Sequence, residues 1–168
     1  MITPEFPQLM ARYNRWQNNS LFDAASTLSE DDRKADRGAF FRSIHGTLNH
    51  ILWADRLWLS RFSDHPMPDA AGFDGSTKMY EIWDELVTAR RATDDFIDGW
   101  VATLSHDDLA GDLSWYSGAI GKELSRPRAV LITHMFNHQT HHRGQVHAML
   151  TAAGARPSDT DIPFMPEL

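Results

Sequence analysis

The sequence contains no cysteine. Disulfide bonds, thiolate metal ligands and a cysteine nucleophile are therefore excluded, and any thiol chemistry would need a thiol supplied from outside the chain. Basic residues are also few, since 16 Lys and Arg stand against 23 Asp and Glu, for a net charge of −7. Because non-specific binding of nucleic acid needs a basic surface, we expect no nucleic-acid partner.

Long apolar runs are missing as well. No run approaches the ~18 residues that a membrane-spanning helix needs. The first ten residues, MITPEFPQLM, lack the basic and apolar regions of a signal peptide. We therefore expect a cytoplasmic protein with no membrane partner. The 168 residues, 42% of them apolar, are enough for a single domain with its own core, over residues 1–168.

Helical periodicity dominates what is present. Four long segments are predicted to be helices: residues 4–28, 40–62, 77–104 and 127–153. Helices of this length, with no linker that would separate domains, favour an all-α fold with a single four-helix bundle. Between the third and fourth helices, residues 112–117 could pair with residues 119–124 as a small hairpin, because Gly118 and Gly121 favour a turn.

Histidine is concentrated in the last helical segment. Five of the nine histidines lie within fourteen residues: His134, His138, His141, His142 and His147. Imidazole is a preferred ligand of zinc and nickel, and two histidines at i and i+4 can bind one ion. On a helical wheel His138 and His142 fall within or beside the apolar arc. His134 and His141 lie at its margin, and His147 points to solvent. The inward pair is either a metal site or a pair of hydrogen-bonded core histidines.

A third ligand would come from another helix. In the segment 40–62, His45 lies in the polar sector of the wheel, so we expect it to face water. His50 lies outside that sector. Gly46 and Ala54, one turn before and after it, would leave room for an ion and its waters. We therefore predict His50, and not His45, as the third ligand.

Asp55 falls in the middle of the apolar arc of the same segment. A carboxylate there must be paired or hydrogen-bonded. It could orient a ligand imidazole. We favour instead a structural contact with an indole N–H or an arginine, because the wheel does not place Asp55 near His50.

Two motifs resemble the DinB/YfiT-like family, which is unrelated to the DNA polymerase of similar name. They are LNHILWADRLW at residues 48–58 and HQTHHRGQ at residues 138–145, and YNRW at residues 13–16 is similar too. The resemblance extends over essentially the whole chain. It implies a four-helix bundle, a homodimer, and a divalent ion, nickel or zinc, bound by His50, His138 and His142. Some relatives transfer low-molecular-weight thiols onto substrates or use them in isomerisation, and others have no established reaction.

Three imidazoles would leave positions open on an ion, which is the arrangement of catalytic sites. Such an ion could activate an exogenous thiol. Three neighbouring residues are candidates for catalytic roles. His141 could carry a proton, although contact with a loop or a partner subunit is favoured. Arg143 could bind a substrate carboxylate, although a surface cation is favoured. Gln145 could hydrogen-bond a histidine or a ligand, and Gly144 is expected to allow close helix packing.

Four functions fit these residues. The first is a metal-dependent S-transferase or isomerase that uses an exogenous thiol. The second is a metal-binding or stress-response protein without turnover; a pocket of substrate size beside the histidines would favour the enzyme. The third is a metal-dependent hydrolase, which lacks an evident general base because no H-E-x-x-H motif occurs. The fourth is a structural histidine cluster in a helical dimer, with tryptophans such as Trp53 and Trp58 in the core or the interface.

Overall fold

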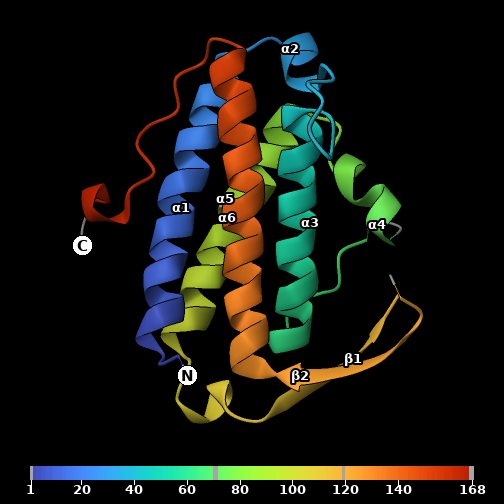
Figure 1. Cartoon of the computed structure of the whole chain (residues 1–168), viewed down its shortest axis with the longest axis vertical. Coiled ribbons are helices and arrows are strands. Elements are labelled where there is room, and N and C mark those ends of the chain that lie inside the picture. The colour runs from blue at the N-terminus through green and yellow to red at the C-terminus, as the bar shows by residue number, and fades with distance from the viewer. Residues whose placement is uncertain (1, 70–71, 119, 167–168) are drawn as a thin grey trace.

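A computed structural model describes residues 2–69, 72–118 and 120–166. These residues are mostly helical, as predicted, with a small two-stranded sheet. Figure 1 shows four long helices side by side: α1 (Glu5–Ser26), α3 (Ile44–Phe62), α5 (Trp83–Ala102) and α6 (Arg128–Ala152). Helices α1 and α3 each pack against both α5 and α6. None of the described helices is long and apolar enough to cross a membrane.

Two of the long helices begin later than the periodicity predicts. Helix α3 begins at Ile44 because the hydroxyl of Ser43 caps it, accepting a hydrogen bond from the Gly46 N–H at 3.0 Å. Helix α5 begins at Trp83, after the short helix η1 (Ser76–Lys78) and an extended Ile82. The apolar pattern continues through this connection, because Met79 and Tyr80 pack against the core without being helical.

Shorter elements connect the long helices. They are α2 (Glu30–Lys34), α4 (Gly72–Gly75), η2 (Asp107–Leu109) and η3 (Ile162–Phe164), and a hairpin of β1 (Asp112–Ser117) and β2 (Lys122–Pro127). The hairpin confirms the predicted first strand, and the second strand begins three residues later than predicted because Ile120 and Gly121, the latter at φ 65°, belong to the turn. Residue 119 of the predicted strand lies outside the described residues.

The core consists of two apolar clusters with a buried polar network between them along the helices. The first cluster includes Leu21, Ile51 and Leu150. The second includes Leu59, Ile97 and Phe136. On α3, Asp55 lies between the residues of the two clusters. Arg90 and Asp94 on α5, and Gln139 on α6, occupy the corresponding positions.

Asp55 makes the arginine contact that the sequence favoured. Its carboxylate accepts hydrogen bonds from Arg90 and Gln139, and Arg90 also pairs with Asp94 at 2.8 Å. Burial raises the pKa of the Asp55 carboxyl, and the charge of Arg90 opposes that rise. Asn18 of α1 donates to Asp94, so the network joins all four long helices. It therefore helps to hold α3 and α6 in a defined register, and these are the helices that carry the predicted ligands.

Candidate metal centre

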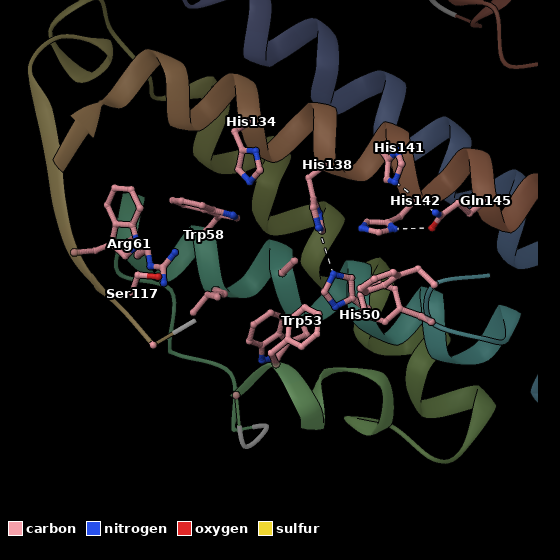
Figure 2. A pocket seen from close by; sticks show the side chains of 18 residues that line it. His50, Trp53, Trp58, Arg61, Ser117, His134, His138, His141, His142 and Gln145 are labelled. Carbon is pink, nitrogen blue, oxygen red and sulfur yellow. Dashed lines mark hydrogen bonds between the residues drawn. The ribbon is translucent and has the colours of Figure 1, made fainter. Parts of the chain in front are cut away.

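The three predicted ligands lie together between α3 and α6. One candidate ligand atom from each of His50, His138 and His142 lies within 4.8 Å of the others. The Nε2 atoms of His50 and His138 are 3.3 Å apart and face one another in Figure 2. Two nitrogens that bind one tetrahedral ion at 2.0–2.1 Å would be about 3.3 Å apart. The spacing of this pair therefore fits a shared ion without movement of the helices.

Hydrogen bonds at the outer nitrogens orient two of the rings. The Nδ1–H of His142 donates to the Gln145 side-chain oxygen at 2.8 Å. Because that oxygen can only accept, the Nε2 atom of His142 keeps its lone pair. The Nδ1 atom of His50 lies 2.9 Å from the hydroxyl of Ser76, a fully buried residue of η1. Gln145 thus hydrogen-bonds a histidine, one of the two contacts considered for it, and its catalytic role stays a prediction.

Burial keeps the rings neutral. It lowers the pKa of His50 to about 3, with a further contribution from the charges that His138 and His142 would carry. The pKa of His138 is lowered to about 3 by burial and then by His142, His134 and His141. Burial also lowers the pKa of His142, which Gln145 partly opposes. A neutral imidazole is the form that binds a metal. The donor set therefore fits a borderline divalent ion such as Zn²⁺ or Ni²⁺.

A strained turn places an aromatic ring against His50. The rings of Phe41 and His50 are stacked, with centroids 3.8 Å apart. Phe41 belongs to a turn closed by a bridge between Ala39 and Arg42, and Arg42 has a φ of 64°, in the left-handed region that favours glycine. A Cβ on Gly46 would lie only 2.9 Å from the carbonyl oxygen of Phe41. The prediction that Gly46 leaves room for an ion is therefore wrong, because it makes room for this turn.

An open cavity of about 840 Å³ adjoins the three histidines. Most of its wall is aromatic. It is lined by Phe40, Phe41, His50, Trp53, Ala54, Leu57, Trp58, Arg61, Gly72, Phe73, Trp115, Ser117, Gly118, His134, His138, His141, His142 and Gln145. Trp53 and Trp58, predicted to lie in the core or an interface, line this cavity. Their spacing of 3 and 8 residues from His50 was the signal for a shared helix face.

None of His45, His134 and His141 belongs to the ligand group. His134 and His141 are exposed at the cavity wall, and the His141 ring centroid is 4.8 Å from that of His142. His45 is buried, and its Nε2–H donates to the Tyr80 carbonyl at 2.8 Å, so the expectation that it faces water is wrong. The choice of His50 over His45 nevertheless agrees with the geometry, because His45 is absent from the group.

Arg143 and Gly144 do not have their predicted surroundings. Arg143 is buried, donates to the side-chain oxygen of Asn14, and lies 5.4 Å from the Tyr13 ring centroid. It is therefore neither a surface cation nor a part of the cavity wall. Burial lowers its pKa to about 10. A Cβ on Gly144 would meet open space, so close packing does not explain this glycine.

The fold and site define a mostly helical protein with a three-histidine group at an aromatic cavity. The sequence profile of the DinB family matches residues 1–168, and the chain therefore belongs to the DinB family. The chain is 23% identical to Protein DinB of Bacillus subtilis (strain 168) over 157 residues, which cover 94% of this chain and 91% of that protein.

A solved structure supports the same fold. The crystal structure of a DinB-like protein from Bacillus cereus ATCC 10987 matches with a TM-score of 0.58 and 18% identity, over 86% of this chain and 91% of that chain. At this identity the match shows the fold alone. The chain has a DinB-like fold, as the two sequence motifs predicted.

Proposed function

We propose that the chain binds a divalent ion, Zn²⁺ or Ni²⁺, through the Nε2 atoms of His50, His138 and His142. The observation that carries this proposal is the convergence of three neutral imidazoles within 4.8 Å at the wall of a large cavity. A four-helix bundle, the arrangement we infer for the long helices, commonly builds such sites from facing helices. Three protein ligands leave at least one position open to a ligand from the cavity.

We further propose that the protein is an enzyme, an S-transferase or isomerase that uses an exogenous low-molecular-weight thiol. When bound, a divalent ion would lower the pKa of a thiol that coordinates it, so that the thiolate would form near neutral pH. The chain has no thiol of its own. In S-transfer the thiol sulfur bonds to an electrophilic carbon, the leaving group departs with its electron pair, and the thiol proton is released.

Residues around the three histidines would position the ligand rings and receive the substrate. Gln145 and Ser76 hold the rings of His142 and His50 in position. Phe41 covers one face of His50 and excludes water there. The indole walls of the cavity receive the apolar part of the electrophile. Proton transfer by His141 stays a prediction. The position of His141 on the cavity wall is compatible with it.

The cavity favours this function over the alternatives. Among the described lining residues none is Asp or Glu, so no carboxylate there offers a general base for hydrolysis. A site that only stored metal would have no use for a cavity of substrate size. We also propose a homodimer and a cytoplasmic location, and sedimentation velocity on the untagged protein tests the former.

Elemental analysis tests the metal site. Untagged protein is compared with the His50→Ala, His138→Ala and His142→Ala variants, and with His147→Ala as a control on the same helix outside the group. We expect near-stoichiometric metal in the wild type and the control, and its loss in the three ligand variants. A wild type that takes up neither Zn²⁺ nor Ni²⁺ in titration would exclude the metal site.

A thiol assay then tests turnover. Loaded protein is mixed with glutathione, cysteine or coenzyme A and the electrophile 1-chloro-2,4-dinitrobenzene, and thioether formation is followed by absorbance. We expect turnover with at least one thiol, lost in His138→Ala. Turnover that survives complete metal removal would contradict the mechanism.

A further inference from the structure

A cation with no acidic partner among the described residues lies at the end of the cavity away from the three-histidine group. Arg61 follows His50 by eleven residues on α3, which is three helical turns. The two residues therefore share a face of α3, and their Cα atoms are separated by about 16 Å along the axis. Figure 2 shows Arg61 beside Trp58 and Ser117, at the opposite side of the cavity from His142 and Gln145.

Two tryptophans hold the guanidinium of Arg61. Its Cζ atom lies 4.6 Å from the Trp58 ring centroid and 5.6 Å from that of Trp115. The attraction of a cation to an aromatic face uses the charge of the guanidinium and does not use up its N–H donors. The two indoles therefore fix the position of the group while its donors remain available to a ligand.

Arg61 differs from the other arginines that are at least partly buried, because each of those donates a hydrogen bond to another described residue and Arg61 donates none. Arg15 also pairs with Asp95 and Asp98, and Arg90 pairs with Asp55 and Asp94. Within residues 2–69, 72–118 and 120–166, no carboxylate forms an ion pair with Arg61. Burial lowers the pKa of Arg61, and no acidic neighbour raises it again. A half-desolvated charge without a counter-ion is costly, and binding an anion would offset that cost.

Arg61 also dominates the electrostatics of the cavity. It is the one Lys, Arg, Asp or Glu side chain among the described lining residues, and the five other titratable groups there are histidines. The rest of the wall is largely aromatic. The cavity thus combines an apolar body with a single positive charge at one end, in a chain whose net charge is −7.

We propose that the substrate of this cavity is an apolar or aromatic molecule with a carboxylate, which Arg61 binds, while its reacting end lies at the three histidines. A guanidinium fork matches a carboxylate in a bidentate pair. One cation balances one negative charge, which favours a carboxylate over a doubly charged phosphate monoester. The position of the reacting end rests on the proposed function; the recognition of the carboxylate by Arg61 does not.

The binding test uses metal-free protein and two probes of equal shape, 6-phenylhexanoate and 6-phenylhexan-1-ol. Affinities are measured by calorimetry and by quenching of tryptophan fluorescence, since Trp58 and Trp115 contact Arg61. We expect the acid to bind the wild type about 10- to 100-fold more tightly than the alcohol. In Arg61→Gln this preference should disappear, with the affinity for the alcohol unchanged. Arg12→Gln, which removes an exposed arginine of α1, is the charge-matched control and should keep it.

Two results would overturn the inference: a wild type without preference for the acid, or an Arg61→Gln variant that keeps it. If Arg61→Gln does not fold, Arg61→Lys keeps the charge without the planar fork, and a clear but smaller preference for the acid is expected there. A preference that is unchanged in Arg61→Lys and equally strong for 6-phenylhexyl phosphate would contradict a carboxylate fork.

A Zn²⁺ titration separates this inference from the proposed function. Arg61→Gln should bind Zn²⁺ as the wild type does, because Arg61 is far from the ligand group. Loss of the acid preference in a wild type that binds Zn²⁺ would overturn only the carboxylate proposal. An acid preference in a wild type that does not bind Zn²⁺ would overturn only the metal site.

Discussion

The amide of Gln139 on α6 donates a hydrogen bond to the carboxylate of Asp55 on α3, and both residues are buried. This bond spans the same two helices as the three-histidine group, and Gln139 directly follows His138 in the chain. Because Asp55 is also paired with Arg90, any shift of α6 against α3 would have to break the network. The buried polar network thus supports the geometry of the candidate metal centre from inside the core.

The Arg90→Ala substitution should strongly lower the free energy of unfolding. It leaves Asp55 and Asp94 buried without their cation, and breaking a buried pair in this way costs about 3–5 kcal/mol. Arg15→Ala is the control, because Arg15 makes ion pairs at the surface with Asp95 and Asp98, and such pairs contribute about 1 kcal/mol or less. Urea denaturation measures both free energies of unfolding. Equal losses in the two variants would contradict a structural role for the network.

Gly46→Ala should destabilise the protein, whereas Gly144→Ala should stabilise it. The new Cβ at residue 46 would lie 2.9 Å from the Phe41 carbonyl oxygen, so the turn over His50 must move, at a cost of about 1–3 kcal/mol. At residue 144 the Cβ meets open space on a helix, where alanine is favoured over glycine by about 1 kcal/mol. Thermal unfolding of both variants provides the comparison, and shifts in the same direction would refute the contact.

Gln145→Ala should weaken metal binding without removing a ligand. Its side-chain oxygen fixes the His142 ring through the Nδ1–H, and loss of such a bond typically costs 10- to 100-fold in metal affinity. Gln145→Glu keeps an acceptor at this place and should retain affinity. Competition of Zn²⁺ against a chromophoric chelator gives the dissociation constants. If Gln145→Ala binds Zn²⁺ as tightly as the wild type, the hydrogen bond has no orienting role.

The stability that His45 contributes should fall in acid. Burial lowers the pKa of His45, with the Tyr80 carbonyl partly opposing the shift. In the unfolded chain histidine takes up a proton below about pH 6.5, whereas folded His45 resists it. The contribution is therefore complete above that pH and is lost as the pH falls toward the folded pKa.

The His45→Gln variant removes this titration while leaving a donor for Tyr80. Urea denaturation of metal-free wild type and variant at pH 8 and pH 5 measures the difference between their free energies of unfolding. We expect the wild type to lose more stability than the variant between these two values. An equal loss would show that His45 does not contribute to the acid sensitivity.

Local patterns predicted the regular parts of the fold well. The apolar periodicity located the four long helices, and Gly118 and Gly121 indicated the hairpin. The ends of helices were less predictable. Helices α3 and α5 begin only after their N-cap residues, Ser43 and Ile82, although the apolar pattern of each segment starts earlier. The i,i+4 spacing of His138 and His142 predicted their proximity, since a helix fixes that distance by itself.

Burial of individual polar residues was not predictable from the wheel. His45 and Arg143 were both expected near solvent, yet Tyr80 and Asn14 supply partners inside the protein. Those partners are 35 and 129 residues away in the chain. Gly46 was likewise misinterpreted, because the turn that approaches it has no periodic signal.

The sequence by itself determined the helical character, the absence of a thiol and the choice of His50, His138 and His142 as candidate ligands. These follow from composition and from spacing along single helices. Only the tertiary structure decided that three imidazoles converge, that indoles line a cavity beside them, and that Arg61 has no acidic partner among the described residues. Such relations depend on how α3, α6 and the hairpin pack together, and contacts between distant segments leave no periodic trace in one sequence.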